Sequence, residues 1–278
     1  METSKVQNAE GQPDVSLRVG TMGWGYSDWN GVFYPSDAAS RDNIALYAKA
    51  FDVVEIDSTF YGTPRETQVK QWAKVTPPNF LFCPKVPRLI THDMGLADVA
   101  EPLGIFARTM GLLGPKRGPM LLQMPPSFTR SDLPALKTFL PTLAELEDPT
   151  ARFAIEFRHR SLIGPDVSAL LTEYGVALAN TDYPLMPCRF EIATDFLYIR
   201  LIGRHGAFPH HRETQADRGK DIERWATILR ENQSRYSIAC IFCNNDYEGY
   251  SPATANTLKC LLGLPIHTPP TEIQGSLF

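Results

Sequence analysis

Eight short apolar runs recur along the chain, and segments with the spacing of an amphipathic helix separate most of them. Most of the runs carry charged or amide residues on one face near their carboxyl ends. This alternation is typical of α/β folds, and eight such strands predict a single (β/α)8 barrel of the TIM type. Because such barrels build their sites at the carboxyl ends of the strands, we expect a polar site there. The runs span residues 17–20, 53–60, 80–86, 120–125, 152–158, 176–182, 196–203 and 237–245.

Helical spacing predicts a helix in most of the intervals between these strands. In the fourth predicted helix, Pro134 is tolerated in the first turn, whereas Pro141 is expected to kink or break the helix. Longer irregular stretches, 183–194 and 204–219, flank the seventh strand. The predicted helices span residues 43–51, 65–75, 98–113, 132–146, 166–174, 220–231 and 252–262.

Length and composition agree with one domain of this kind. A chain of 278 residues, 43% of them hydrophobic, suits the core of one barrel. We expect the barrel over 15–267, a disordered tail over 1–14 and a flexible tail over 268–278. The net charge of −4 does not by itself indicate a nucleic-acid or membrane partner, and no apolar run approaches a membrane span. Because the first residues lack the apolar core of a secretory signal, we expect a soluble, cytoplasmic protein.

The five cysteines do not form the pattern of a disulfide framework. Cys240 and Cys243 make a C-x-x-C motif, but they fall within a predicted strand, where residues three apart point to opposite faces. Their sulfur atoms therefore would not converge on a metal or form a redox pair, and we interpret both as small buried residues.

Alternation along the strands assigns most of the charged residues in the runs to the inside of the barrel. In the fifth run, Phe153, Ile155 and Phe157 form the apolar face that must meet the helices. Glu156 and Arg158 therefore point inward. The same reasoning places on the inner face, or at the inner end of a strand, Glu55, Asp57, Lys85, Gln123, Asp182, Arg200 and Asn244.

The inward charges predict a polar site, because burying an unpaired charge is costly and each must pair or bind a ligand. Lys85, Arg158 and Arg200 are cations that suit a phosphate or carboxylate group on a substrate. Glu55 and Glu156 are candidates for the general acid and the general base. An enzyme with an anionic substrate would use both sets.

Further polar residues at the strand ends extend this hypothesis. Asp57 and Asp182 are additional catalytic candidates, and Gln123 and Asn244 could orient water or substrate hydroxyls. The alternative is structural: the same charges could form a salt-bridge network that plugs the mouth of the barrel without any chemistry.

A divalent metal is a less favoured cofactor hypothesis. Asp57, Glu156, Asp182 and His92 could supply oxygen and nitrogen ligands, and His92 is also a candidate for substrate binding. However, the chain has no H-x-H or H-E-x-x-H spacing, and the adjacent histidines at 210–211 fall in a loop, where solvated side chains are the ordinary interpretation.

A series of motifs, in order along the chain, resembles one family. They occupy residues 19–29, 33–35, 51–61, 72–80, Lys85 with 90–92, 122–128, 156–159, 198–203 and 242–245. Together, over residues 17–264, they resemble the YecE-like family, domain of unknown function 72. The resemblance implies a TIM-type barrel but no established activity. Two positions depart from the family pattern: Leu162 stands where a tryptophan is usual, and Ile202 replaces a histidine.

Aromatic residues cluster after the first two predicted strands, at the same end as the charges. They are Trp24, Tyr26, Trp29, Phe60 and Tyr61. These rings could form a stacking platform for a base or sugar of a substrate. Equally, they could cover the top of the barrel.

The last residues of the chain carry a separate hypothesis. Gln274, Leu277 and Phe278 resemble the short glutamine–leucine–phenylalanine peptide with which bacterial DNA-repair and replication proteins bind the sliding clamp. A short segment with two apolar anchors and one amide can dock in a groove at a small entropic cost. The alternative is an ordinary chain terminus with two apolar residues.

Two functions are consistent with these patterns. The first is a TIM-barrel hydrolase or lyase acting on an anionic substrate, with phosphate- and nucleic-acid-derived compounds included. The second is a non-catalytic module that binds a small anion or nucleotide and is tethered to the clamp. Nucleic-acid binding would require a basic rim, for which Arg204, Arg212, Arg218 and Lys220 are available. Carboxylates with a raised pKa in an open site would favour catalysis, whereas fully paired carboxylates would favour a plug.

Overall fold

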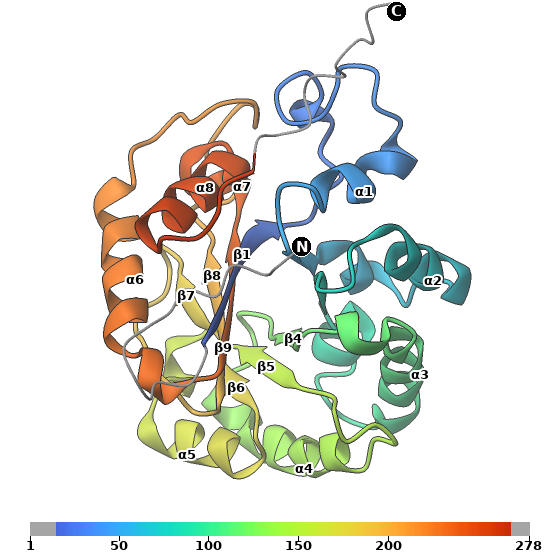
Figure 1. Cartoon of the computed structure of the whole chain (residues 1–278). Helices are drawn as coiled ribbons and strands as arrows, with labels where there is room; N and C mark the ends of the chain where they lie inside the picture. Colours follow the sequence, from blue (N-terminus) through green and yellow to red (C-terminus); the bar gives the residue numbers. More distant parts are fainter. Residues whose placement is uncertain (1–14, 268–278) are drawn as a thin grey trace, which may run out of the picture.

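The computed structural model describes residues 15–267, so both predicted tails lie outside it. It has an α/β fold in which every pairing between described strands is parallel and helices surround the sheets, as Figure 1 shows. One sheet has the order β3-β2-β1-β9-β8-β7 and the other β4-β5-β6. The strands are β1 (Ser16–Met22), β2 (Val53–Ile56), β3 (Leu81–Pro84), β4 (Met120–Gln123), β5 (Phe153–Glu156), β6 (Ala177–Leu178), β7 (Asn180–Asp182), β8 (Phe196–Leu201) and β9 (Ile238–Cys243).

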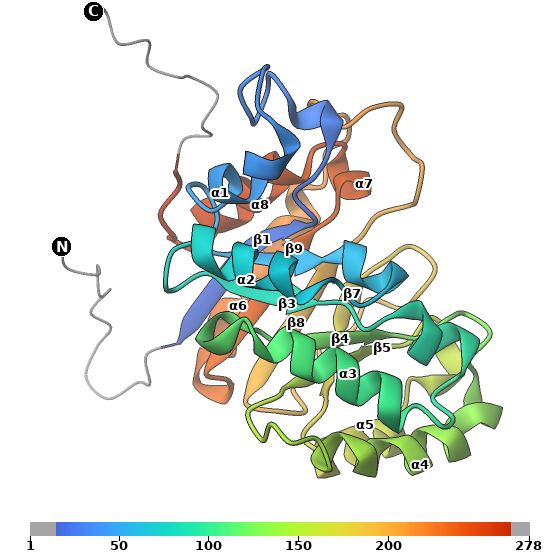
Figure 2. The ribbon, with the colours of Figure 1, turned by 90° about the vertical axis from the view of Figure 1, so that its right-hand side faces the viewer.

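Helices alternate with the strands, and all seven predicted helices are present within a few residues of their expected bounds. Figure 2 shows α2, α3 and α4 following one another along one side of the molecule. The short helix α7, directly after β9, was not expected from the sequence. The helices are α1 (Asn43–Tyr47), α2 (Glu66–Val75), α3 (Ala100–Gly111), α4 (Leu133–Ala144), α5 (Pro165–Glu173), α6 (Gly219–Glu231), α7 (Asn245–Glu248) and α8 (Ser251–Leu261).

Helix α4 continues through Pro141 to Ala144, so the predicted break is wrong. A proline removes one helical hydrogen bond, the bond that its own N–H would donate to the carbonyl four residues earlier. Here that carbonyl belongs to Lys137, which is exposed, so water can hydrate it. The cost of the proline is correspondingly smaller than in a buried helix.

Strand β2 ends at Ile56 and gives way to a 3-10 turn over Asp57–Tyr61, whereas the sequence pattern predicted a strand as far as residue 60. The Thr59 hydroxyl explains the change. It lies 2.7 Å from the carbonyl oxygens of both Ile56 and Lys85, and accepts a hydrogen bond of 3.0 Å from the Lys85 N–H. A threonine that bonds nearby backbone in this way competes with the strand ladder.

The two sheets are not joined into one closed ladder, so the predicted barrel is present only in part. Between β3 and β4 the pairing is reduced to isolated bridges, with backbone hydrogen bonds of 2.8 Å from Gly118 to Phe82 and from Val86 to Leu121. Pro84, at the end of β3, has no N–H with which to continue that ladder.

The sixth predicted strand links the sheets on the other side, but it is divided. Its first part, β6, pairs with β5, and its second part, β7, pairs with β8. Ala179 lies between them and still donates a hydrogen bond of 2.8 Å to Ile155. One continuous segment therefore contacts both sheets in succession.

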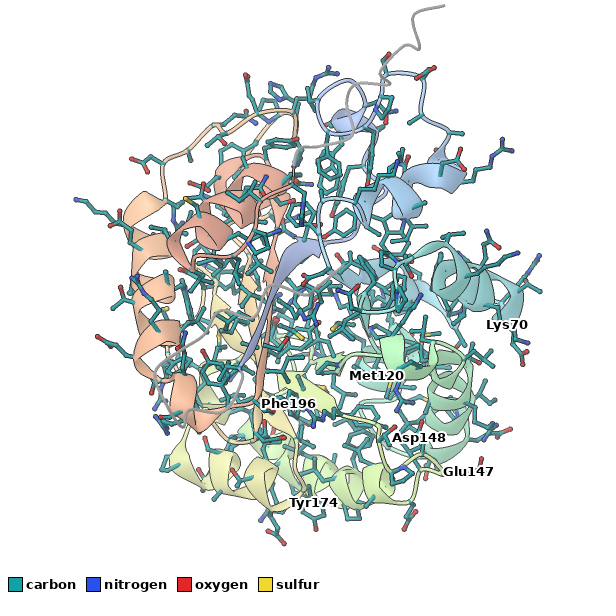
Figure 3. The ribbon with its side chains drawn as sticks, in the orientation of Figure 1. Lys70, Met120, Glu147, Asp148, Tyr174 and Phe196 are labelled. Atoms are coloured by element: carbon teal, nitrogen blue, oxygen red, sulfur yellow. The ribbon has the colours of Figure 1, made fainter. Side chains whose placement is uncertain are left out.

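Apolar side chains pack in two layers, one inside the sheets and one between the sheets and the helices. Cys240 belongs to the inner layer and Cys243 to the outer layer, and both are free thiols, which confirms their predicted opposite faces. Figure 3 shows side chains filling the space enclosed by the strands, including Phe196 of the inner layer. No helix within residues 15–267 is long and apolar enough to cross a membrane.

Candidate functional site

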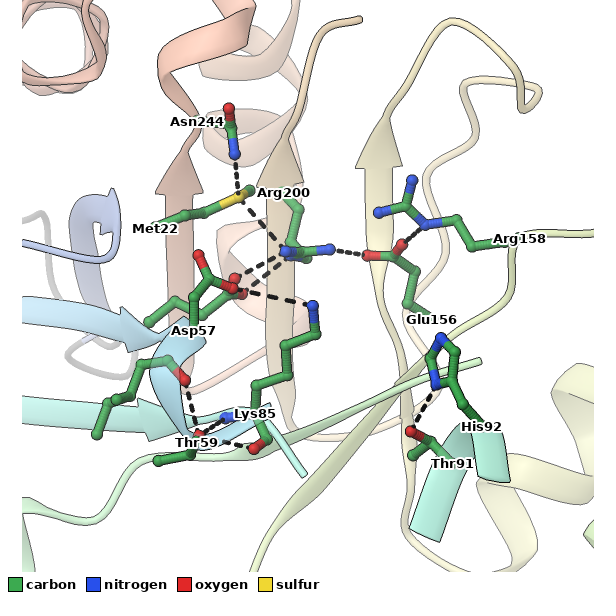
Figure 4. Close-up of polar contacts among 12 residues, drawn as sticks. Met22, Asp57, Thr59, Lys85, Thr91, His92, Glu156, Arg158, Arg200 and Asn244 are labelled. Atoms are coloured by element: carbon green, nitrogen blue, oxygen red, sulfur yellow. Dashed lines mark hydrogen bonds and ion pairs between the residues drawn. The ribbon is translucent and has the colours of Figure 1, made fainter. Parts of the chain in front are cut away.

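A buried arginine is the centre of the charge cluster inside the sheets. Arg200, on β8, donates hydrogen bonds of 2.9 and 2.7 Å from Nε and Nη2 to the two carboxylate oxygens of Glu55. Its other terminal nitrogen, Nη1, contacts Glu156 of β5, and Nη2 also lies 3.4 Å from the Met22 sulfur (Figure 4). The predicted inward orientation of all three charged residues is confirmed.

The two glutamates have opposite electrostatic environments. Burial raises the pKa of the Glu55 carboxyl, and the attraction of Arg200 does not fully cancel this effect. Burial also acts on Glu156, but there Arg200 and Arg158 outweigh it, so the Glu156 pKa is lowered. Tyr198 donates a further hydrogen bond of 2.7 Å to Glu55. Because both Glu55 oxygens already have partners and its side chain is 0% exposed, Glu55 cannot reach a substrate.

A second group of charges lies nearer the ends of the strands and is open to solvent. The Asp57 side chain is 35% exposed, and its Oδ1 lies 3.9 Å from the Lys85 ammonium. That ammonium also lies 4.3 Å from the centre of the Phe60 ring. Asp57 is therefore the inward carboxylate that a substrate could approach. The sequence alone did not show that Asp57 is more accessible than the two glutamates.

Arg158 follows β5 and completes this outer group. Its Nε forms an ion pair with Glu156, and its guanidinium lies 4.2 Å from the centre of the Tyr183 ring. Its two terminal nitrogens make no hydrogen bond with any residue in 15–267. Glu156 thus holds the Nε of this guanidinium and Tyr183 contacts its flat face, while the fork formed by its two terminal nitrogens stays unpaired. Such an arrangement suits the binding of a carboxylate or phosphate.

Two predicted amide residues border the same region. Gln123, the last residue of β4, is half-buried, and within residues 15–267 its side chain has no hydrogen bond. Asn244 follows β9; its Oδ1 accepts a hydrogen bond of 2.8 Å from the Asp246 N–H, and its Nδ2 faces the Met22 sulfur at 3.4 Å. Met22 was missed as a site residue, although its register opposite Glu55 follows from the pairing of β1 with β2.

His92 and its neighbours form one side of the mouth. The His92 Nδ1 lies 2.9 Å from the Thr91 hydroxyl, and its ring packs edge-on against Phe60 at 5.0 Å. Burial, together with the nearby charges of Lys85 and Arg88, lowers the His92 pKa. The His92 ring therefore stays neutral to a lower pH than the ring of an exposed histidine does.

The predicted aromatic platform is divided by the structure. Trp29 is fully buried and belongs to the core, whereas Trp24 is half-buried and packs edge-on against Trp72 of α2 at 5.5 Å. Tyr26 donates a hydrogen bond of 2.7 Å to the Met22 carbonyl. Phe60 lies beside Lys85 and His92, and Tyr61 is 86% exposed, so these two rings are the members of the platform that remain near the charges.

Asp182 does not face the interior, so its predicted place in the inward set is wrong. Ala177 and Ala179 occupy the inner layer, and alternation then turns Asp182 toward helix α6. Its carboxylate accepts hydrogen bonds of 3.1 Å from the Trp225 indole and 2.9 Å from the Tyr247 hydroxyl. It also pairs with two arginines, Arg218 and Arg224.

The predicted basic rim is also reduced. Arg218 pairs with Asp182 and Asp221 and lies over the Tyr247 ring, so it stabilises the fold around α6. The other three rim residues, Arg204, Arg212 and Lys220, are exposed. Within 15–267, no group of three or more His, Cys, Asp or Glu residues is arranged to hold a metal ion.

A separate hollow of about 570 Å³ lies between helices α3 and α4, away from the charge cluster. Arg108, Glu145 and Asp148 contribute its polar lining. Figure 3 shows Glu147 and Asp148 at the outer edge of the molecule. None of the predicted site residues lines this hollow.

Comparison with known proteins assigns this chain to a family. The family described as "Protein of unknown function DUF72" matches residues 18–274. The UPF0759 protein YecE of Escherichia coli K12 is 30% identical over 51% of this chain and 48% of its own length. The UPF0759 protein YunF of Bacillus subtilis is 28% identical over 54% of this chain and 53% of its own length. The chain thus spans about half the length of the curated relatives it matches.

Solved structures give the same grouping. A DUF72 family protein from Thermotoga maritima superimposes with a TM-score of 0.77 at 26% identity, over 89% of this chain and 99% of that chain. A DUF72 family protein from Enterococcus faecalis, 20% identical, has a TM-score of 0.74 over 92% of this chain and 98% of that one, and supports the fold alone. The three residues predicted to bind a sliding clamp lie outside the described residues, so that hypothesis stays a prediction.

Proposed function

We propose an enzymatic function for this chain, which belongs to the DUF72 family of proteins of unknown function. In this proposal the eight strand segments act as one (β/α)8 barrel. The mouth at the carboxyl ends of the strands is the active site of a hydrolase or lyase that acts on a small anionic substrate. The substrate carries a carboxylate or a phosphate group.

The unpaired fork of Arg158 is the observation that carries this proposal. Within residues 15–267 its terminal nitrogens have no hydrogen-bond partner, although Glu156 and Tyr183 hold the rest of the guanidinium in place. A structural ion pair would normally use the fork itself, because bidentate pairing is the stronger geometry. The free fork therefore supports an external anion as its partner.

The buried triad of Glu55, Arg200 and Glu156 has a different role in this proposal. It forms the floor of the site, and it fixes Glu156 so that Arg158 is correctly oriented. This part of the cluster corresponds to the salt-bridge plug considered from the sequence. Proton transfer then falls to Asp57, whose exposed carboxylate lies beside Lys85.

The chain offers a control for Arg158 at the other end of the same strand, β5. Arg152 precedes β5 at its opposite end, pairs with Asp195 and lies 5.4 Å from the centre of the Phe196 ring. Both arginines thus combine one carboxylate with one aromatic face, but only Arg158 is at the mouth. Substitution of each by alanine separates a local anion site from a general loss of positive charge.

Isothermal titration calorimetry with inorganic phosphate and with malonate tests the proposal. We expect Arg158→Ala to weaken binding by about tenfold or more, because hydrogen bonds to charged groups contribute about 1.5–3 kcal/mol. Arg152→Ala should bind as the wild type does. Equal affinities for the two variants would remove Arg158 from the site. Tight binding without turnover of phosphate esters or oxo acids would favour the non-catalytic anion-binding module.

A further inference from the structure

Lys85 has a position in the mouth that an anion-binding role does not fully explain. The residue directly follows β3, and Thr59 fixes its backbone through both its N–H and its carbonyl oxygen. Figure 4 shows its side chain rising from this point toward Asp57, beside Arg200. Only 11% of the side chain is exposed, so most of the lysine stem packs against the protein.

The amine of Lys85 is not engaged in a hydrogen bond. Its closest carboxylate oxygen, on Asp57, is 3.9 Å away, beyond the range of a hydrogen bond, and no other residue in 15–267 bonds to the amine. A structural lysine that is this well buried ordinarily uses its donors. The nitrogen is therefore free to contact a ligand.

The surroundings of Lys85 make its neutral form accessible. Burial lowers the pKa of the ammonium, and the neighbouring Arg200 lowers it further, whereas Asp57, Glu55 and Glu156 oppose these effects. The net direction is downward from the ordinary lysine value.

Two further elements face Lys85. The Phe60 ring favours the charged form by a cation–π contact. From the turn after β3, the half-buried His92 ring and Arg88 belong to the same electrostatic environment, since Lys85 and Arg88 both lower the His92 pKa. A lysine with a lowered pKa in a partly desolvated site is suited to attack a carbonyl carbon.

We propose that Lys85 is a nucleophile that forms an imine with the carbonyl group of an anionic substrate, while Arg158 holds the carboxylate or phosphate of that substrate. Because this inference rests on the proposed function, it makes the enzyme specifically a lyase of oxo acids or of phosphorylated carbonyl compounds. The structural elements are the free amine of Lys85, the free fork of Arg158 and the exposed carboxylate of Asp57.

The reaction balances with groups that are already in the mouth. Asp57 accepts a proton from the Lys85 ammonium, and the neutral amine adds to the carbonyl carbon. The C–N bond forms as the π pair of the carbonyl moves to its oxygen, which then takes a proton from the nitrogen and gives a carbinolamine. Asp57 then returns the proton to the hydroxyl, which leaves as water, and the nitrogen lone pair forms the iminium. When the bond between the adjacent carbon and a hydroxyl-bearing carbon then breaks, its electron pair forms the carbon–carbon double bond of an enamine, and the π pair of the iminium returns to nitrogen. The detached fragment leaves as an aldehyde after its hydroxyl gives a proton to Asp57. Protonation at carbon and addition of water then release the product and restore the lysine.

Reductive trapping tests this proposal on the full chain without knowledge of the natural substrate. The protein is incubated with pyruvate and sodium cyanoborohydride, and the modified lysines are identified by peptide mass spectrometry. Lys70 is the internal reference, because it is exposed on α2 (Figure 3) and paired with Glu66 in an ordinary surface ion pair. Acetone serves as the matched probe, since it has the same carbonyl group without the carboxylate.

We expect pyruvate to modify Lys85 about tenfold faster than Lys70 at neutral pH, because the lowered pKa of Lys85 favours its neutral amine and Arg158 holds the carboxylate of the probe beside it. Acetone should show a much smaller preference, and Arg158→Ala should reduce the pyruvate preference while it leaves the Lys70 rate unchanged. Asp57→Asn should slow the modification of Lys85, because no carboxylate then carries the proton.

Modification of Lys85 no faster than Lys70 at any pH, with pyruvate and with glycolaldehyde phosphate, would overturn the imine proposal. If phosphate and malonate still bind in an Arg158-dependent way in that case, the proposed function survives and only the role of Lys85 is wrong. If they do not bind, the anion site itself is wrong. The wild-type measurement needs no variant, so a failure of a variant to fold leaves the test intact.

Discussion

Removal of the Arg200 guanidinium tests whether the charges of the buried triad of Glu55, Arg200 and Glu156 compensate one another. In Arg200→Met, a side chain of similar length keeps much of the apolar packing but removes the hydrogen bonds of 2.9 and 2.7 Å to Glu55 and the contact with Glu156. Glu55 is 0% and Glu156 1% exposed in their side chains, so water cannot replace the lost partner.

The magnitude of the effect follows from this burial. Breaking a buried ion pair by removing one partner costs about 3–5 kcal/mol, because an uncompensated charge remains inside the protein. Glu156 keeps Arg158 as a second partner, whereas Glu55 keeps only the Tyr198 hydroxyl. We therefore expect Arg200→Met to lower the free energy of unfolding by about 4 kcal/mol at pH 8.

The loss should depend on pH in a defined direction. In the wild type the Glu156 pKa is lowered, so its contribution to stability is present above its unfolded pKa and is lost as the pH falls. In the variant, the loss of Arg200 raises the already raised pKa of Glu55 further and removes the larger of the two attractions that lower the Glu156 pKa, so stability is lost more steeply as the pH rises. The difference between variant and wild type should shrink as the pH falls from 8 toward 5.

Urea unfolding followed by circular dichroism at pH 5 and pH 8 measures this difference. Lys70→Met is the control, because it breaks an exposed pair of 2.9 Å with Glu66 and should change stability by no more than about 0.5 kcal/mol. A loss below about 1 kcal/mol for Arg200→Met, or a loss that does not vary with pH, would refute the reasoning that these charges are buried and mutually compensated.

Three further variants test other parts of the structure. Tyr198→Phe removes one hydrogen bond to Glu55 but leaves the arginine pair intact, so thermal unfolding should show a loss of only about 1 kcal/mol. Asp182→Ala leaves the Trp225 indole and its neighbouring donors unpaired and should cost about 1–3 kcal/mol or more, with phosphate affinity by calorimetry unchanged, since this carboxylate faces α6. Deletion of residues 274–278 should abolish binding to a purified bacterial sliding clamp in surface plasmon resonance without a change in melting temperature; retained binding would show that the terminal peptide is not the contact.

Much of the site could be predicted from the sequence because it depends on the two-residue period of strands. Phe153, Ile155 and Phe157 had to meet the helices, so Glu156 and Arg158 had to face inward, and they do. However, the two-residue period does not indicate which of the inward charges pair with one another. The partner of Arg200 lies 145 residues away in the chain, and only the fold brings the two together.

The errors of sequence reasoning have local physical causes. The predicted closed barrel is interrupted at Pro84, which has no N–H to donate to the neighbouring strand. It is interrupted again at Ala179, where one strand passes from one sheet to the other. Asp182 lies just after that transition, where the pattern of alternation was hardest to assign. Thr59 ended its strand through side-chain bonds that no apolar period reveals.

A crystal structure of the wild-type protein soaked with phosphate tests the central claim most directly. We expect phosphate density at the mouth, with oxygens within hydrogen-bonding distance of the Arg158 terminal nitrogens and near the Lys85 amine. Density confined to another hollow, such as the one between α3 and α4, with Arg158 and Lys85 instead paired to carboxylates of the protein, would contradict the proposal that the mouth is an anion-binding active site.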